Sequence, residues 1–127
     1  MPTPISYFKK QIRSFGYAIK GLKLMWKDHN TWVHVPAAFI VVGLGYGFGV
    51  SRNEWLWLII AIALMWIGET FNTAIEKLVD LVSPNHHELA GKVKDIAAGG
   101  VLLCLFFSLL IGSLVFFPYL FNLLYGK

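Results

Sequence analysis

Apolar residues follow two patterns along the chain, and together the patterns divide it into four helical segments. Between residues 5 and 26 they recur every three or four positions, with basic side chains largely off that line, which predicts an amphipathic helix. Three later runs, at about 31–50, 55–80 and 96–120, are long enough to cross a hydrocarbon core of about 30 Å. We therefore predict an all-α fold with an N-terminal surface helix and three transmembrane helices.

Composition agrees with this pattern. Of the 127 residues, 57% are hydrophobic and only 14% are charged, and no charged residue lies between Asp95 and Lys127. These values indicate one small integral membrane domain over residues 1–127, in contact with a lipid bilayer. The net charge of +4 is not accompanied by an aromatic–basic motif, so nucleic acid is not an expected partner.

Basic residues predict the orientation of the chain in the membrane. Six Lys and Arg residues lie between the N-terminus and Lys27, and three Lys residues lie in the segment 77–95. The turn at 51–54 and the C-terminal tail carry only one basic residue each. By the positive-inside rule, the N-terminus and the connection after the second span face the cytoplasm.

Several small and helix-breaking residues predict local structure. Gly43, Gly45, Gly47 and Gly49 have the spacing that favours close helix packing in lipid. Ser51 is expected to be a turn or cap residue. Ser83 and Pro84 are interpreted as the N-cap and first residue of the next helix. Pro118 is expected to bend or end the last helix.

Four polar side chains interrupt the second apolar run and share one stripe of the predicted helix. Glu69, Asn72, Glu76 and Asp80 fall within an arc of about 80°, at about 100° per residue. If the span begins at Trp55, Glu69 lies inside the hydrocarbon core near one face and Glu76 emerges at that face. Because ionisable groups in lipid are costly, such a stripe indicates a functional site.

The residue types indicate what this site can do. Carboxylates near the cytoplasmic surface can bind a divalent cation, and Lys92 and Lys94 can neutralise phosphates. A carboxylate in apolar surroundings can act as a base toward a hydroxyl, so these parts fit phosphoryl transfer to a lipid alcohol. The chain has no Walker-type loop, kinase Gly-rich loop or GxSxG motif. Spacing alone therefore leaves the reaction open.

A longer sequence resemblance narrows the choice of reaction. The segment from Glu69 to Leu103, ETFNTAIEKLVDLVSPNHHELAGKVKDIAAGGVLL, resembles the signature of the prokaryotic diacylglycerol kinase and undecaprenol kinase family. That signature is approximately E-x-x-N-[ST]-A-I-E-x-x-[VL]-D, followed by a His-containing loop and K-D. The segment from Gly16 to Lys27 resembles the family's surface helix more loosely.

The resemblance implies a homotrimeric kinase in a bacterial inner membrane that transfers the ATP γ-phosphoryl group to a lipid alcohol. Glu69 is then the general base, with Asn72 beside it, and Glu76 binds the Mg²⁺ that bridges the ATP phosphates. Asp80 orders the loop after the second span. The nucleotide is bordered by Lys10, Tyr17, Glu76, Asn85, His86, His87, Lys94 and Asp95. Association also has a physical motive, because three spans cannot surround a polar stripe by themselves.

One position departs from the family pattern, which has a second metal-binding Glu near the first span. Alignment on Asn30 and His34 places Asp28 there, whereas ungapped counting from Tyr17 places His29 there. Asp28 is the better candidate, since a neutral histidine is a poor magnesium ligand.

Two other functions stay open from the sequence: a catalytically silent membrane protein on the same scaffold, and a lipid phosphatase. The phosphatase is disfavoured because no Arg-rich phosphate pocket is apparent. The acceptor is undecaprenol or diacylglycerol. The stretch VDLVSP is more similar to the undecaprenol branch.

Overall fold

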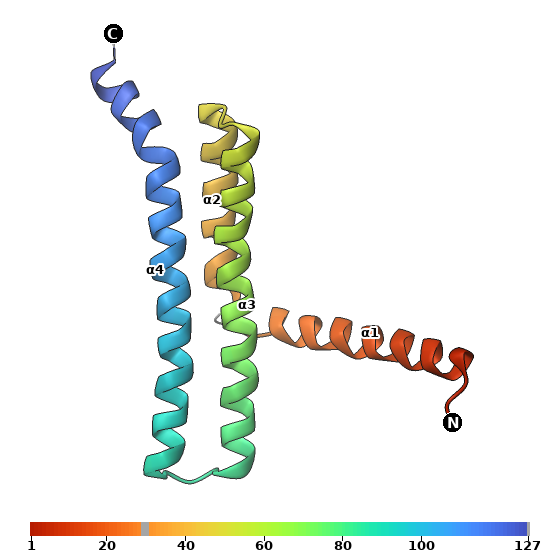
Figure 1. Cartoon of the computed structure of the whole chain (residues 1–127). Helices are drawn as coiled ribbons and strands as arrows, with labels where there is room; N and C mark the ends of the chain where they lie inside the picture. The colour runs from red at the N-terminus through yellow and green to blue at the C-terminus, as the bar shows by residue number, and fades with distance from the viewer. Residues whose placement is uncertain (29–30, 127) are drawn as a thin grey trace.

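The computed structural model of the chain describes residues 1–28 and 31–126 and contains four helices in these ranges. They are α1 (Pro4–Trp26), α2 (Thr31–Phe48), α3 (Arg52–Val82) and α4 (Glu88–Tyr125). In Figure 1, α2, α3 and α4 stand side by side, while α1 leaves the bundle across its axis. Three of the described helices are long and apolar enough to cross a membrane. The prediction of a surface helix and three transmembrane helices is confirmed.

The turn between α2 and α3 is built by local side-chain caps. The Ser51 hydroxyl accepts the N–H of Glu54 at 3.2 Å, and the Glu54 carboxylate accepts the N–H of Ser51 at 3.1 Å. This reciprocal pair is a capping box, which satisfies donors that a helix start leaves open. The predicted role of Ser51 as a cap is confirmed.

The prediction for Ser83 and Pro84 is wrong. Ser83 ends α3, with its N–H donating to the Val79 carbonyl, and α4 begins only at Glu88. The N-cap of α4 is His87, whose Nδ1 accepts the N–H of Leu89 at 3.2 Å. The physical reason is that a residue before proline avoids the helical region, so the Ser–Pro pair stops the preceding helix.

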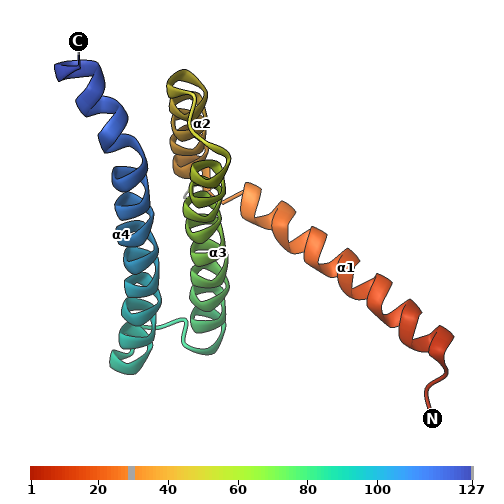
Figure 2. The ribbon, with the colours of Figure 1, turned by 45° about the horizontal axis from the view of Figure 1, so that its top comes forward.

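Close packing occurs at the predicted small residues only in part. Gly45 is buried, and a Cβ atom there would lie 2.5 Å from the Trp55 ring, so the absence of a side chain at Gly45 leaves room for the tryptophan. Gly43 and Gly47 have open space around them. The last helix continues through Pro118 to Tyr125, and Figures 1 and 2 show its last turns tilted away from the bundle.

The apolar core lies at the end of the bundle that contains the α2–α3 turn. It is formed by the buried residues Val50, Leu58, Val115 and Phe116. At the same end, the Tyr119 hydroxyl donates to the Glu54 carboxylate at 2.6 Å and ties α4 to the start of α3. This packing fixes α3 against its neighbours far from its polar half.

The other end of the bundle is an extended helical hairpin. α2 has 18 residues, whereas α3 has 31 and α4 has 38. At about 1.5 Å per residue these lengths are roughly 27, 46 and 57 Å. The connection 83–87 lies at the end of this hairpin, well beyond the start of α2 (Figure 1). The polar residues of α3 therefore lie partly beside α2 and partly beyond it.

Candidate active site

The end of α1 and the start of α2 contact α3 close to the candidate site. The Thr31 hydroxyl donates to the Met25 carbonyl at 2.6 Å, and the Trp32 indole donates to the Trp26 carbonyl at 2.9 Å. The rings of Trp26 and Trp66 lie 5.6 Å apart between centroids. These contacts attach the end of α1 to α3 within one helical turn of Glu69.

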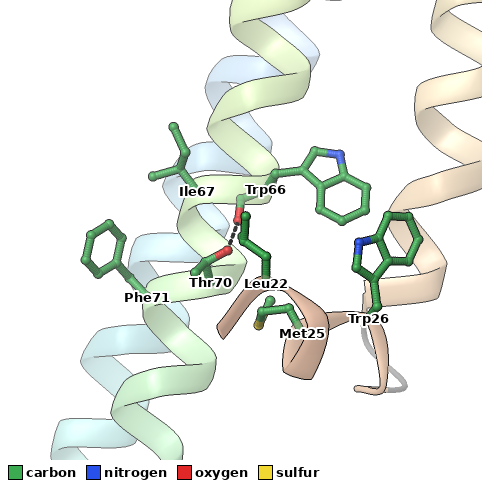
Figure 3. A pocket seen from close by; sticks show the side chains of 7 residues that line it. All are labelled: Leu22, Met25, Trp26, Trp66, Ile67, Thr70 and Phe71. Carbon is green, nitrogen blue, oxygen red and sulfur yellow. Dashed lines mark hydrogen bonds between the residues drawn. The ribbon is translucent and has the colours of Figure 1, made fainter. Parts of the chain in front are cut away.

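An apolar pocket of about 390 Å³ lies at this junction. Figure 3 shows side chains of α1 and α3 around it, with the Thr70 hydroxyl bonded back to the Trp66 carbonyl at 2.7 Å. Its lining consists of Leu22, Met25, Trp26, Trp66, Ile67, Thr70 and Phe71. An apolar chain can therefore lie beside the polar stripe of α3 without exposing itself to water.

Glu69 faces α2 and meets a histidine there. The Nε2 atom of His34 lies 3.0 Å from Oε1 of Glu69. The two side chains are only 18% and 12% exposed, respectively. A carboxylate in this position is mostly removed from water and has one defined polar partner in the described residues.

Asn72 and Glu76 form the next contact along the stripe. The Asn72 amide donates to Oε1 of Glu76 at 3.2 Å. Asn72 is buried, at 8% exposure, and its Oδ1 has no hydrogen-bond partner in the described part of the chain. A buried acceptor without a partner is costly, so this oxygen is suited to a ligand that supplies a donor or a cation.

Asp80 continues the stripe and contacts α4. Its carboxylate accepts a hydrogen bond from Nζ of Lys94 at 2.5 Å. Lys94 precedes the third predicted span, at 96–120. The hydrogen bond with Asp80 raises the pKa of Lys94 above its usual range, so the amine is charged at neutral pH. This places a fixed positive charge beside the acidic stripe.

The connection 83–87 has a defined conformation near these residues. The Ser83 hydroxyl donates to the Asn85 carbonyl at 3.1 Å, and His87 caps α4. The side chains of Asn85, His86 and Asp95 are exposed. All of these residues lie at the hairpin end of the bundle, together with Lys94.

The remaining predicted site residues lie on or after α1. Lys10 and Tyr17 are exposed residues of α1, and among the described residues no hydrogen bond or ion pair joins either of them to the α3 stripe. Asp28 is partly buried in the α1–α2 connection, where its N–H donates to the Met25 carbonyl at 3.0 Å. His29 lies outside the described residues.

Comparison with known proteins identifies the family. Residues 16–116 match the family model for prokaryotic diacylglycerol kinase. The chain belongs to the prokaryotic diacylglycerol kinase family. This membership makes it a membrane-embedded lipid kinase, as the resemblance in Glu69–Leu103 implies.

Three relatives from this kinase family show the breadth of the similarity. The undecaprenol kinase of Bacillus subtilis is 38% identical over 110 residues, which cover 84% of this chain and 87% of the relative. A diacylglycerol kinase of Helicobacter pylori is 32% identical over 113 residues, covering 87% of this chain and 88% of the relative. The diacylglycerol kinase of Haemophilus influenzae is 30% identical over 108 residues, covering 84% and 92%.

The donor set of this kinase suits magnesium better than a transition metal. Among the described residues, no group of three His, Cys, Asp or Glu side chains is placed to hold an ion. Magnesium needs no such cage, because it commonly binds one or two carboxylates together with waters and substrate phosphates. The Glu76 carboxylate and the unpartnered Oδ1 of Asn72 are hard oxygen donors of this kind.

Sequence reasoning missed one member of the site. His34 enters the sequence argument only as an alignment marker, yet it contacts Glu69 directly. The available signal was a single imidazole inside the otherwise apolar first span. The same argument that singles out polar groups in lipid applies to it.

Proposed function

We propose that this lipid kinase transfers the γ-phosphoryl group of ATP, with Mg²⁺, to the hydroxyl of undecaprenol at the cytoplasmic face of a bacterial inner membrane. The observation that carries the proposal is the polar face of α3, which begins at Glu69, level with the end of α1. Family membership supports the reaction class, and the contacts of this face support the assignment of roles.

The position of α1 indicates how deep the polar face of α3 lies in the membrane. An amphipathic helix with a basic side lies flat in the membrane interface, and α1 meets α3 at Trp66. Glu69 is therefore near the interface, where the hydroxyl of a lipid alcohol lies. Glu76 and Asp80 are about 10 and 16 Å further along α3, on the aqueous side.

This depth gives each polar residue a distinct role. Glu69 accepts the proton of the lipid hydroxyl as the hydroxyl oxygen attacks the γ-phosphorus, while the bond between that phosphorus and ADP breaks and ADP leaves. Glu69 suits this role because it is the deepest carboxylate of the stripe and is only 12% exposed. Glu76 and Asn72 hold Mg²⁺, and Asp28 is a further candidate ligand. When bound, the ion neutralises charge on the β- and γ-phosphate oxygens.

The hairpin end of the bundle supplies the residues that bind ATP. Lys94 carries its charge beside Asp80, where it can balance phosphate oxygens. Asn85, His86, His87 and Asp95 border the same region and are accessible to the base and ribose of ATP. Because ATP is cytosolic, the hairpin end and the N-terminus face the cytoplasm, in agreement with the distribution of basic residues.

Assembly completes the site. In one chain the stripe is partly open, because Asp80 is exposed and Glu76 is only partly buried, and no hydrogen bond or ion pair among the described residues joins Lys10 or Tyr17 to it. Neighbouring copies shield the stripe from lipid and can bring α1 residues to the nucleotide. We propose the homotrimer that the family resemblance implies.

Undecaprenol is proposed as the acceptor because the Bacillus subtilis undecaprenol kinase, at 38% identity, is closer to this chain than the diacylglycerol kinases at 30–32%. One apolar cavity lies between α1 and α3, and another lies between α2, α3 and α4. Both are lined by Trp66, one turn before Glu69, so the hydrocarbon chain of a lipid alcohol can extend from the site into either cavity. Diacylglycerol is the second candidate, since it also presents a hydroxyl at the interface.

The test is a side-by-side assay of the purified protein with ATP, Mg²⁺ and either lipid in mixed micelles. We expect phosphorylated undecaprenol at a kcat/KM at least about tenfold above that for diacylglycerol, a preference of about 1.4 kcal/mol. Equal or reversed preference contradicts undecaprenol as the acceptor. Absence of phosphorylation of both lipids contradicts the proposed reaction.

A further inference from the structure

The contact between His34 and Glu69 gives the proposed base a partner from another helix. The Nε2 and Oε1 atoms are 3.0 Å apart, and the residues are 35 positions apart in the chain. An ionised carboxylate can only accept hydrogen bonds, so the proton of a neutral His34 ring lies on Nε2. The hydrogen bond then holds one oxygen of Glu69 and leaves the other, Oε2, for the lipid hydroxyl.

We propose that His34 is a positioning residue for Glu69: it fixes the carboxylate by the hydrogen bond from Nε2 so that Oε2 faces the acceptor hydroxyl. The proposal rests on the proposed role of Glu69 as the base. It assigns to His34 no proton transfer and no contact with ATP.

The surroundings of His34 explain why this hydrogen bond matters. The ring lines an apolar cavity of about 150 Å³ between α2, α3 and α4, together with Met65 and Trp66. Water cannot easily replace a lost donor in such surroundings, so the carboxylate would keep several rotamers instead of one. The hydrogen bond from His34 therefore contributes more to the orientation of the Glu69 carboxylate than the same bond would at a solvent-exposed site.

The start of α2 is itself held in place, which makes His34 a suitable anchor. Thr31 and Trp32, less than one turn earlier, donate hydrogen bonds to the last carbonyls of α1. The orientation of Glu69 is thus connected through His34 to the helix that lies on the membrane surface.

Steady-state kinetics of two variants give the first test. We expect His34→Ala to lower kcat by about 10- to 100-fold, as misplaced catalytic groups do, with the KM for ATP changed less than about twofold. His34→Gln keeps an N–H donor near the place of Nε2 and should recover most of the loss. Val33→Ala, an exposed neighbour, is the matched control and should retain wild-type kcat.

A spectroscopic measurement separates positioning from a merely structural role. In protein labelled with ¹⁵N-histidine, we expect the His34 ring, assigned by its loss in His34→Gln, to carry its proton on Nε2. Its signals should move in Glu69→Ala while those of His86 and His87 stay in place. This readout needs no lipid substrate, so it remains decisive even if the proposed acceptor or reaction is wrong.

Three results would overturn the inference: wild-type kcat in His34→Ala, no recovery in a folded His34→Gln, or a neutral His34 ring protonated on Nδ1. Thermal unfolding of each variant establishes that it is folded. Loss of activity toward both lipids in the wild type would instead contradict the proposed function, with the NMR result still reporting on the contact.

Discussion

Replacement of Glu69 by glutamine is expected to lower kcat for lipid phosphorylation by about 10²- to 10⁴-fold, the range for loss of a general base. Glutamine has nearly the same shape, and its side-chain oxygen can still accept a hydrogen bond from His34, whose Nε2 lies 3.0 Å from Oε1 in the wild type. Its amide cannot take up the proton of the lipid hydroxyl. The expected loss is therefore in the chemical step, with the KM for ATP little changed.

The measurement is a steady-state assay with thermal unfolding in the same detergent. Glu54→Gln is the matched control: it changes a carboxylate on the same helix, at the opposite end, where Glu54 contacts Ser51 and Tyr119. We expect that variant to keep at least about half of the wild-type kcat, since a cap has no part in proton transfer. Near-wild-type turnover in Glu69→Gln would contradict its role as the base.

Replacement of Glu76 by glutamine is expected to raise the Mg²⁺ concentration for half-maximal activity by at least about tenfold, the smallest loss typical even for outer-shell partners of a metal. The substitution removes a charged oxygen ligand but keeps an oxygen that can accept from the Asn72 amide. Activity should recover in part at high Mg²⁺, because the base is untouched. This recovery distinguishes a metal ligand from a catalytic group.

Magnesium titrations at saturating ATP give the comparison. Glu88→Gln is the matched control, because this carboxylate lies at the same end of the bundle but pairs with Lys92 on the exposed side of α4. Its titration should coincide with that of the wild type. An unchanged titration in Glu76→Gln would remove Glu76 from the metal site.

Much of the fold was predictable because each helix carries its own signal. The amphipathic period of α1 and the apolar runs of α2, α3 and α4 are local properties of the sequence, and so is the stripe of Glu69, Asn72, Glu76 and Asp80. The structure keeps this stripe on one helix, as expected, and adds Lys94 to it.

The boundaries near the hairpin end were less predictable. A Ser–Pro pair starts one helix or stops another depending on the chain before it, and here α3 runs on to Val82. The apolar run of the third span begins near Ile96, yet α4 already begins at Glu88. Charged residues outside the lipid are compatible with a helix, and the pair Glu88–Lys92 at i,i+4 supports it.

The contact of His34 with Glu69 depends on how α2 packs against α3, which no local pattern contains. Periodicity shows which face of a helix carries a residue, but not which residue of another helix lies opposite. The separation of 35 positions along the chain makes this a tertiary feature. A lone imidazole in an apolar span was nevertheless a usable indication of a site.

The most direct test of the central claim, that the polar face of α3 opens to the compartment that holds ATP, is the sidedness of the 83–87 connection. Asn85, exposed in this connection, is changed to cysteine in a Cys104→Ala background and treated with a membrane-impermeant maleimide. We predict labelling in inside-out membrane vesicles and none in intact cells. Labelling in intact cells would place the connection outside the cytoplasm and contradict the account.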